Sequence, residues 1–469
     1  MSCFDQDRRS SRGLCPATST DRVAKSLTLA AMSLGYAVVQ LDVTIVNTAL
    51  NSIGASLGGG LSGMQWVVSS YTIAFAALIL TAGAMGDRVG AKRMFMAGFA
   101  IFTAASLTCA LAPGAAILIA ARAVQGVGAA ILVPNSLALL NHAYADENER
   151  GRAVGIWAAG ASIALTAGPL AGGALIALVG WRSIFLVNLP VGLVGLWLTW
   201  RYATETARSS QRREFDLFGQ AAAIGALGCL AGAIIEGGAL GWSDPGVLAG
   251  FAGFAVLAAL FVLQEWRARQ PMLPLSLFRH RLFSLTALIG LLVNVAFYGL
   301  IFVLSLYFQQ VNGLSPLVTG LAFLPMMGAV LPANLLAARA AKRFGAAAII
   351  AAGASIAGAG CLALLGIDRG TSYWAMCAQL LAMGAGLGLL VPPLTSTLLG
   401  SVEKSRSGVA AGVLNSTRQT GSVLGVALFG SLLGQANAFL PGARTSLIVA
   451  AILLLGAAVA IMVGGRKQE

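Results

Sequence analysis

The chain has 469 residues, of which 58% are hydrophobic and only 10% are charged. Soluble domains carry about 25% charged residues, so this composition excludes an ordinary soluble protein and predicts a polytopic membrane protein. A formal net charge of +13 could indicate nucleic-acid binding in a soluble chain. Basic loops are also what orients a chain in a membrane, and we therefore expect no nucleic-acid partner.

The first 25 residues are polar, include five basic residues and contain no early apolar core. Such a composition predicts a disordered cytoplasmic tail over residues 1–25 rather than a cleaved signal peptide.

Crossing a bilayer takes about 20 apolar residues in a helix. Fourteen stretches of the chain meet this requirement, and they are separated by polar or glycine-rich turns. The predicted spans are 27–50, 65–86, 94–112, 115–140, 153–178, 183–200, 217–239, 246–264, 282–309, 318–338, 346–366, 373–400, 408–434 and 444–464.

The distribution of Lys and Arg tests this count. With both termini inside, the cytoplasmic segments hold five basic residues in the N-terminal tail, then three, two, four, four, three and two in successive loops, and two at the C-terminus. The outside loops hold only Arg182, Arg369 and Arg444. Basic residues concentrate in cytoplasmic loops. The pattern therefore predicts fourteen spans in the cell (inner) membrane, with both termini cytoplasmic.

The chain also contains an internal duplication. Residues 126–134 and 384–392 share the pattern G-x-G-x-x-x-L-V-P at an offset of 258, and the loop segments 149–152 and 403–406 share a charged pattern at an offset of 254. The hairpin at 87–90 has a weaker copy 255 residues later. These landmarks pair spans that are eight apart, which preserves orientation, so they indicate parallel repeats of six helices.

The repeats divide the chain into units. We expect one six-helix bundle over residues 26–201 and a second over 282–465. The segment 202–281 would hold cytoplasmic linkers and two inserted transmembrane helices, and 466–469 would be a short cytoplasmic tail. The predicted fold class is thus all-α, with fourteen transmembrane helices in two parallel-repeat bundles plus two inserted helices.

Several motifs resemble those of the major facilitator superfamily, and specifically its fourteen-span drug:proton antiporters. The segment 83–95 is similar to the superfamily's loop motif between spans 2 and 3, although Met85 and Ala91 depart from it. Residues 118–130 match its span-4 motif, including Arg122 and Gln125.

Three further segments strengthen the resemblance. Residues 168–173 match the span-5 signature G-P-x-x-G-G associated with export, and residues 41–47 are similar to the span-1 motif of the fourteen-span branch. Residues 181–190 resemble the entry pattern of span 6 in that branch. The resemblance implies the major facilitator fold and a proton-coupled antiporter that exports lipophilic small molecules, from the cytoplasm or inner leaflet, by alternating access.

Two other functions stay open at this point. One is a dedicated exporter of a single antibiotic or siderophore, and the other is a nutrient importer driven by proton symport. The chain has no G-x-x-x-x-G-K-[ST] phosphate loop, and its six cysteines and two histidines form no metal-binding pattern. We therefore expect no enzyme activity, no cofactor, no metal and no use of ATP. The expected partners are a small-molecule substrate, protons and the lipid bilayer, and the expected state is a monomer.

Four formal charges fall within the predicted spans, where each costs about 2.5–3.5 kcal/mol at a helix centre. Asp42 lies eight residues before Leu50, and Arg122 lies nine residues after Pro113 on a helix of opposite direction, so both are predicted at similar depth. We interpret Asp42 as the proton-carrying carboxylate and Arg122 as the charge that regulates its proton affinity. The alternative is a static ion pair that only holds the bundle together.

The other two charges are Glu236 and Arg418. Glu236 lies near the outer end of the seventh span, where a structural role competes with a second coupling role. Arg418 lies in the middle of the thirteenth span, where it could line a substrate cavity or lock the helix. The tentative cavity residues are Asn47, Gln125, Asn294, Tyr298, Asn415, Arg418 and Gln419.

Two more groups complete the predicted site. Asp87, Arg88 and Arg152 are interpreted as a conformational latch at the cytoplasmic ends of the helices, with a solvated turn as the alternative. The small residues of span 5 would permit close helix approach and bending in an export-type gate; they are Gly168, Pro169, Gly172 and Gly173.

Overall fold

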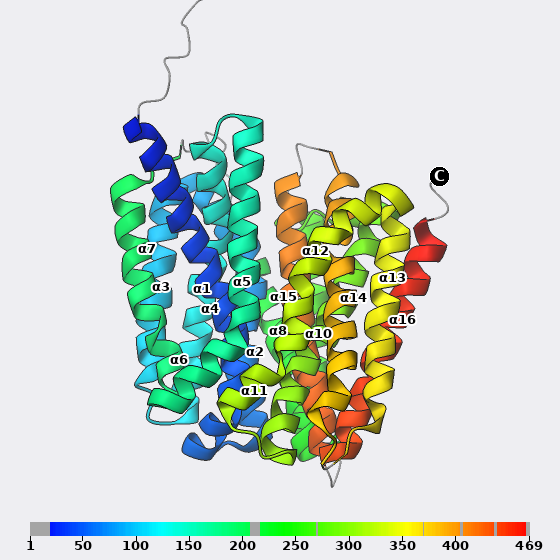
Figure 1. Cartoon of the computed structure of the whole chain (residues 1–469). Helices are drawn as coiled ribbons and strands as arrows, with labels where there is room; N and C mark the ends of the chain where they lie inside the picture. The colour runs from blue at the N-terminus through cyan, green and yellow to red at the C-terminus, as the bar shows by residue number, and fades with distance from the viewer. Residues whose placement is uncertain are drawn as a thin grey trace, which may run out of the picture.

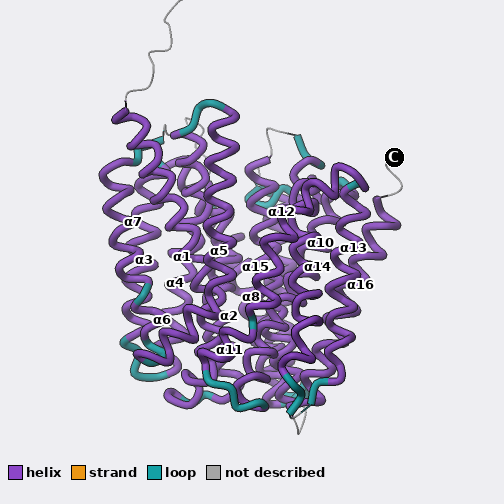
Figure 2. Tube along the Cα trace, in the orientation of Figure 1, coloured by secondary structure: helices purple, strands orange, loops and turns teal. Residues whose placement is uncertain are grey.

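The structure is a computed structural model that describes residues 19–206, 216–268, 271–368, 370–403, 407–435 and 439–465. Throughout these segments the chain is helical with short turns, and Figure 2 shows no strand among them. The fold class is therefore all-α, as predicted. Residues 1–18 of the expected tail and the tail at 466–469 lie outside the described residues.

The helices follow one another in an up-and-down order. Those before the first inserted helix are α1 (Ser19–Leu57), α2 (Gly60–Val89), α3 (Ala91–Ala110), α4 (Ala115–Ala143), α5 (Glu147–Val179), α6 (Ser183–Leu186) and α7 (Asn188–Tyr202). The inserted helices are α8 (Leu217–Leu240) and α9 (Pro245–Arg267). The remaining elements are η1 (Leu275–Arg279), α10 (Arg281–Leu306), η2 (Tyr307–Val311), α11 (Pro316–Ala322), α12 (Leu324–Phe344), α13 (Ala346–Ala363), η3 (Leu364–Gly366), α14 (Tyr373–Gly400), α15 (Ser407–Gln435) and α16 (Phe439–Gly465).

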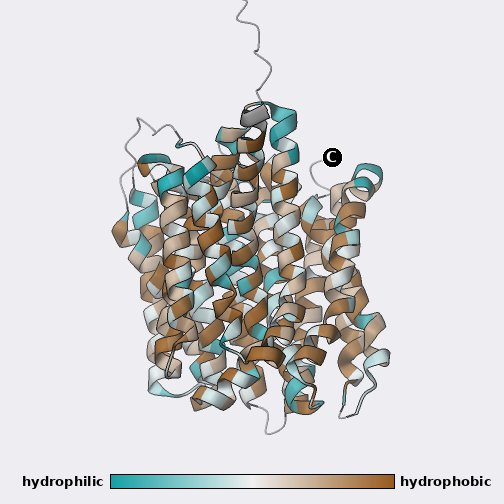
Figure 3. Ribbon diagram, turned by 60° about the vertical axis from the view of Figure 1, so that its left-hand side comes forward, coloured by the Kyte–Doolittle hydropathy of each residue, from teal (hydrophilic) through white to brown (hydrophobic). Residues whose placement is uncertain are grey.

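Thirteen stretches of the described chain are helical, long and apolar enough to cross a membrane. Helix α15 provides a fourteenth of 29 residues, which is long enough at 1.5 Å per residue but more polar in its middle. It packs against α2, α8 and α10 rather than standing alone in lipid, so it can carry polar side chains. Figure 3 shows hydrophobic residues along the helices and hydrophilic residues gathered toward their ends. The chain is a multi-pass membrane protein.

Some helix bounds differ from the predicted spans for identifiable reasons. Helix α1 begins at Ser19, inside the segment predicted to be disordered, and its second turn contacts neighbouring helices: Lys25 pairs with Glu149 at 3.6 Å, and its carbonyl accepts from Tyr144 Oη at 3.0 Å. The sixth span is split into α6 and α7, since Pro190 lacks an N–H and its ring conflicts with the carbonyl four residues earlier. Pro325 splits the tenth span into α11 and α12 in the same way.

The two six-helix bundles contain α1–α7, drawn from blue to green in Figure 1, and α10–α16, drawn from yellow-green to red. Their closest helix contacts repeat along the chain. A Cβ at Gly126 of α4 would collide with the Tyr71 carbonyl of α2, and one at Gly384 of α14 would collide with the Met326 carbonyl of α12. Only glycine allows backbones this close. The duplication seen in the sequence is therefore also a duplication of helix packing.

A second repeated contact lies at the opposite face from the termini. Arg182 donates from Nη2 to the Ala112 carbonyl at 3.3 Å, and Arg444 donates from Nη2 to the Ile367 carbonyl at 3.0 Å. The two acceptors are 255 residues apart, which is the offset of the repeats. Two of the three basic residues in the predicted outer loops thus donate to equivalent carbonyls in the two bundles.

The inserted helix α8 is fastened to α2 at both ends. Near one end, the Glu236 carboxylate accepts hydrogen bonds from Ser62 Oγ at 2.8 Å and from Trp66 Nε1 at 2.9 Å. Near the other end, Gln220 Nε2 donates to the Ala77 carbonyl at 2.9 Å. Through these bonds Glu236 anchors the inserted helix to α2. This contact agrees with the structural role, which was one of the two roles predicted for this residue.

Contacts between the bundles join α2 to α15 and α5 to α11. Gln65 Nε2 of α2 donates to the Ala427 carbonyl of α15 at 2.9 Å, and Ser305 Oγ of α10 donates to the Asn47 carbonyl of α1 at 2.7 Å. The start of α1 and the end of α16 lie on the same face of the molecule (Figure 1), as an even number of spans requires.

Candidate functional site

A buried ion pair lies inside the N-terminal bundle. Asp42 of α1 has no exposed surface and Arg122 of α4 is 1% exposed. The guanidinium Nη1 contacts Asp42 Oδ2 in a salt bridge. The two residues lie at the same depth, as the helix lengths predicted, and each neutralises a charge that would otherwise be costly in this position.

Three neutral side chains complete the surroundings of the carboxylate. Asp42 Oδ1 accepts hydrogen bonds from Gln125 Nε2 at 2.9 Å and from Asn188 Nδ2 at 3.2 Å. Ser106 Oγ accepts from the same two amides at 3.1 and 2.8 Å. Helices α1, α3, α4 and α7 each contribute one or more of these groups, so a movement of any of them changes the hydrogen bonding of Asp42. We call Asp42, Ser106, Arg122, Gln125 and Asn188 the buried polar cluster.

Arg122 has other partners besides Asp42. Its Nε donates to the Val67 carbonyl at 3.2 Å, and its Nη1 also donates to Gln125 Oε1 at 2.7 Å. The Tyr71 ring of α2 stacks on the guanidinium with 4.2 Å between the ring centroid and Cζ, within the range of a cation–π interaction. The guanidinium therefore has alternative partners on α2 and α4 if its contact with Asp42 is broken.

Sequence reasoning found the two charges of this cluster but missed most of its neutral members. Ser106 and Asn188, like the neighbouring Tyr71, are single polar residues in apolar helices, and such residues carry no periodic signal. Gln125, which was predicted to line a substrate cavity, is fully buried in this structure and is hydrogen-bonded within the cluster. Its position three residues after Arg122, on the same helix face, is the signal that points to this location.

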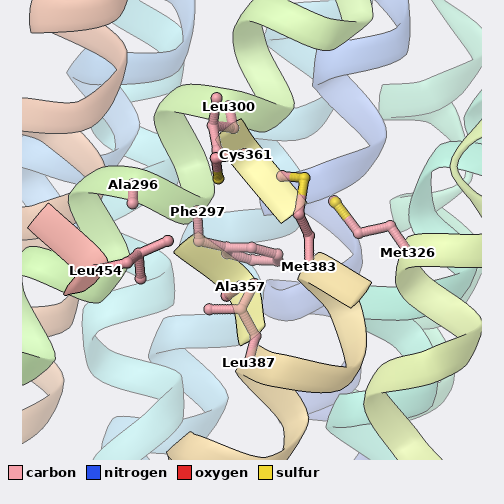
Figure 4. A pocket seen from close by; sticks show the side chains of 9 residues that line it. All are labelled: Ala296, Phe297, Leu300, Met326, Ala357, Cys361, Met383, Leu387 and Leu454. Carbon is pink, nitrogen blue, oxygen red and sulfur yellow. The ribbon is translucent and has the colours of Figure 1, made fainter. Parts of the chain in front are cut away.

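The equivalent place in the C-terminal bundle is apolar. Met326 and Cys361 follow Tyr71 and Ser106 by 255 residues, and Met383 follows Gln125 by 258. These three side chains surround a small cavity together with Ala296 and Phe297, which stand 254 and 255 residues after Asp42 (Figure 4). Its volume of about 10 Å³ is at the lower limit for one water molecule.

The remaining predicted cavity residues lie on α1, α10 and α15. The Asn47, Asn294 and Asn415 amides donate to carbonyls of their own helices at 3.0, 2.6 and 3.0 Å. Tyr298 of α10 has Arg418 of α15 and Tyr36 of α1 as electrostatic neighbours. Gln419 is buried, and its Oε1 has no hydrogen-bond partner among the described residues. Tyr298 is thus within electrostatic range of Arg418, from its own bundle, and of Tyr36, from the other bundle, whereas the asparagine amides are bonded to their own helices.

The predicted latch residues lie on the face that carries the termini. Asp87 and Arg88 are exposed in the last turn of α2, and Arg152 is exposed near the start of α5. A residue that sequence reasoning missed, Glu205, binds the other side of this hairpin. Its Oε1 accepts from the Lys92 backbone N–H at 2.9 Å, and its Oε2 lies 3.8 Å from Arg93 Nε. A carboxylate at the first turn of α3 suits the positive end of the helix dipole.

The glycines of α5 contact two different helices. A Cβ at Gly168 or Gly172 would collide with Thr44 or Ile45 of α1, inside the same bundle. A Cβ at Gly173 would collide with the backbone of Pro316 and Leu317 in α11, and the Pro169 carbonyl lies against Gly320 of α11. The predicted export-motif helix is therefore the place where the two bundles approach most closely on this side of the molecule.

Among the described residues, no three His, Cys, Asp or Glu side chains come together in a group that could hold a metal ion.

A family model described as Major Facilitator Superfamily matches residues 32–426. The chain is 37% identical over 440 residues to the methylenomycin A resistance protein of Streptomyces coelicolor, covering 94% of this chain and 92% of that protein. It is 40% identical over 407 residues to the multidrug resistance protein Stp of Mycobacterium tuberculosis, covering 87% and 75%.

Solved structures share the fold at low sequence identity. A peptide transporter of the POT family, crystallised in an auto-inhibited form, superposes with a TM-score of 0.69 at 15% identity, covering 94% of this chain and 97% of that one. A bacterial homologue of the human lysosomal transporter Spinster, in an inward-facing and unoccupied conformation, superposes with a TM-score of 0.65 at 17% identity, covering 95% and 97%.

Proposed function

The chain belongs to the major facilitator superfamily, and we propose that it exports lipophilic small molecules from the cytoplasm or inner leaflet in exchange for protons. The observation that carries the proposal is the fully buried Asp42–Arg122 pair at the junction of four helices. The antibiotic-resistance and multidrug-resistance relatives support drugs or toxic metabolites as the substrates. The protein would be a transporter and not an enzyme.

Proton exchange follows from the two sets of partners of Arg122. While the guanidinium contacts Asp42, the carboxylate is neutralised and needs no proton. If Arg122 is drawn toward the Val67 carbonyl and the Tyr71 ring, the carboxylate is left buried without its counter-charge, and burial without a counter-charge favours the neutral, protonated form of a carboxyl group. Return of Arg122 expels the proton.

Alternating access would couple this exchange to transport. The bundles touch through α2 with α15 and through α5 with α11, and rocking about these contacts would open one face at a time. The buried polar cluster includes groups from α1 and α4 and rests against α2, so rotation of the N-terminal bundle's helices would shift Arg122 relative to Asp42. Gly173 and Gly320 allow the α5–α11 contact to close, and the latch of Asp87, Arg88 and Arg152 would hold one state.

The substrate would bind between the bundles, near Tyr298 and Arg418. Tyr298 of α10 and Tyr36 of α1 offer aromatic surface from both bundles, and the Tyr36 ring stacks on Trp157 of α5 at 4.2 Å between centroids. Aromatic surface with a few polar groups suits flat lipophilic molecules. We place the bundles at 26–201 and 282–465, the termini in the cytoplasm and the protein, as a monomer, in the cell (inner) membrane.

A transport assay in inverted membrane vesicles tests the proposal. With the vesicle interior acidified by respiration, vesicles that contain the protein should accumulate several chemically unrelated lipophilic compounds, and nigericin, which collapses the pH gradient, should abolish the accumulation. Control vesicles lack the protein. Gradient-driven movement of solute out of such vesicles would instead establish an importer and contradict the proposal.

A single-compound exporter is the second candidate, because the methylenomycin A resistance relatives are named for one antibiotic. A panel of unrelated compounds separates the two. Accumulation of only one antibiotic from the panel would favour the dedicated exporter.

A further inference from the structure

A larger cavity lies between the inserted helices and the contact of α2 with α15. Its volume is about 350 Å³, within the range of about 300–1,000 Å³ that is typical of small-molecule sites. Side chains from α2, α8, α9, α10, α15 and the segment before η1 line it. The cavity is distinct from the buried polar cluster, which contains no residue of α8, α9 or α15.

The lining of this cavity is aromatic and apolar with one polar edge. Phe254 and Phe261 of α9 and Phe278 of η1 supply three phenyl rings, and Ser416, Thr417 and Thr420 of α15 supply hydroxyls. Ser416 Oγ already donates to the Ala76 carbonyl of α2 at 2.9 Å. Phenyl faces attract cations as well as apolar groups.

A buried carboxylate lies one helical turn beyond the lining of α9. Glu265 follows Phe261 by four residues and Val262 by three, which places it on the same helix face as these two lining residues. Only 3% of the surface of Glu265 is exposed. One oxygen, Oε2, accepts from the backbone N–H of the lining residue Leu273 at 2.9 Å, and the backbone N–H of Met272 also favours the charged carboxylate. Oε1 has no close hydrogen bond among the described residues.

A second carboxylate adds to this negative charge. Asp216 caps α8 by accepting from the Gly219 N–H at 2.7 Å and also accepts from Gln264 Nε2 at 3.1 Å, both through Oδ1. Its Oδ2 is buried without a hydrogen-bond partner in the described part of the chain, and Asp216 and Glu265 repel each other electrostatically. A buried carboxylate needs a counter-charge or further hydrogen bonds, and a neighbouring carboxylate increases that need.

We propose that this cavity binds a lipophilic cation of drug size, with its apolar body among Phe254, Phe261 and Phe278 and its positive group against Glu265. The bound cation would satisfy Glu265 Oε1 and reduce the repulsion from Asp216, while its rings or alkyl groups would replace lipid in the cavity. Because the cavity spans α2, α8, α9, α10 and α15, such a ligand contacts both bundles and the inserted pair at once. The inserted helices thereby form a binding site for a cation that is separate from the predicted central site.

Photolabelling of the purified full-length protein locates this site without measuring transport. The probe is ethidium monoazide, a lipophilic aromatic cation, followed by peptide mass spectrometry. Labels are expected in peptides of α8, α9 and η1. Glu265→Gln, which keeps an acceptor for the Leu273 N–H, should reduce these labels at least tenfold, and Ala258→Phe, which fills the cavity, should do the same.

Matched variants make the result specific. Ala259 is the exposed neighbour of Ala258 on α9, so Ala259→Phe should leave the labelling unchanged. Glu236→Gln removes another carboxylate of the inserted helices but keeps an acceptor for Ser62 and Trp66, so it should also leave the labelling unchanged. Circular dichroism verifies that each variant is folded.

Two competition experiments test whether the site requires a positive charge and where the bound cation comes from. Uncharged phenanthridine should not compete with the label. Competition by phosphatidylethanolamine, but not by phosphatidylcholine, in nanodiscs would identify a lipid ammonium as the occupant, and lack of competition would identify a soluble cation. Labelling of α8, α9 and η1 that persists undiminished in Glu265→Gln, or labels confined to other helices, would overturn the proposal.

Discussion

The two six-helix bundles share their helix packing but differ in what fills their centres. In both, glycines of the fourth helix allow near contact with the second: Gly126 lies against Tyr71 and Gly384 against Met326. The N-terminal bundle then places Asp42 and Arg122 in its core. The C-terminal bundle has Ala296 and Phe297 at 254 and 255 residues after Asp42, where they line a small apolar cavity (Figure 4), and it has Leu380 at 258 residues after Arg122.

The difference separates two requirements of the fold. Close helix packing through small residues is needed in both bundles, so it survives in both copies. Buried charges are not needed for packing, because the C-terminal bundle forms the same arrangement without them. The buried charges of the N-terminal bundle therefore indicate a function other than stability, and proton exchange is the one that we propose. The hairpins also differ in charge: the N-terminal copy has the carboxylate Asp87 where the second copy has Lys342.

The largest effect is expected from placing the C-terminal residues in the N-terminal core. Arg122→Leu alone leaves Asp42 buried without its counter-charge, which costs about 3–5 kcal/mol. The double variant Asp42→Ala, Arg122→Leu removes both charges and should recover most of that free energy of unfolding, yet it should abolish gradient-driven export. Thermal unfolding and vesicle transport measure the two effects. A double variant as unstable as Arg122→Leu would show that the pair is needed for the fold.

A substitution at the contact between the bundles should have the next largest effect. A side chain at Gly173 collides with the backbone of Pro316 and Leu317 in α11, and overpacking costs about 1–3 kcal/mol. Gly173→Leu should therefore disfavour the present arrangement and slow transport about tenfold, since about 1.4 kcal/mol corresponds to a factor of ten.

Gly456 provides the control for this substitution, because no atom would lie within 4 Å of a Cβ at this position of α16. Gly456→Leu should leave transport unchanged. Equal losses in the two variants would show that any large side chain in a helix is harmful and that the α5–α11 contact has no special role.

Gln125, a neutral member of the buried polar cluster, provides a finer test of the difference between the two bundles. Gln125→Met introduces the residue found at the equivalent position, Met383, and removes hydrogen bonds to both Asp42 and Arg122. Bonds to charged groups contribute about 1.5–3 kcal/mol, so the free energy of unfolding should fall by about 2 kcal/mol. In the C-terminal bundle, Met383→Leu preserves volume and should cost less than about 1.5 kcal/mol. Chemical denaturation of the purified variants measures both, and equal costs would contradict the account.

The smallest effect is expected at the hairpins. Asp87→Asn removes a carboxylate that can make charge-assisted bonds when the latch closes, so transport should fall by up to about tenfold with little change in thermal stability. Lys342→Gln at the equivalent hairpin position should change transport less than about twofold, because surface charges contribute little. Similar losses of transport in both variants would show that the two hairpins contribute equally, which would contradict the expected difference between them.

The fold could be predicted from the sequence largely because hydrocarbon penalises charge. The basic residues mark the loops, and repeated glycine motifs mark the duplication, so the number and order of helices followed. The same penalty singled out Asp42 and Arg122, and their distances from helix ends placed them together. Helix bounds such as the start of α1 at Ser19 depend on contacts with other helices, and no local pattern encodes them.

The rest of the site was harder to predict because its members are neutral or lie near helix ends. Ser106 and Asn188 cost little to bury once they are hydrogen-bonded, so nothing in the sequence distinguishes them from other small polar residues. Glu265 lies one residue beyond the predicted eighth span and reads as a solvated helix end. Its burial depends on the segment containing Leu273, which folds back over the end of α9.

The most direct test of proton exchange is the substrate-induced release of protons from purified protein in weakly buffered detergent solution. On addition of a transported compound, the wild-type protein should release protons, and Asp42→Asn should release none while it still binds the compound and still exchanges it in counterflow. Proton release by Asp42→Asn equal to that of the wild type would contradict the assignment of Asp42 as the proton carrier.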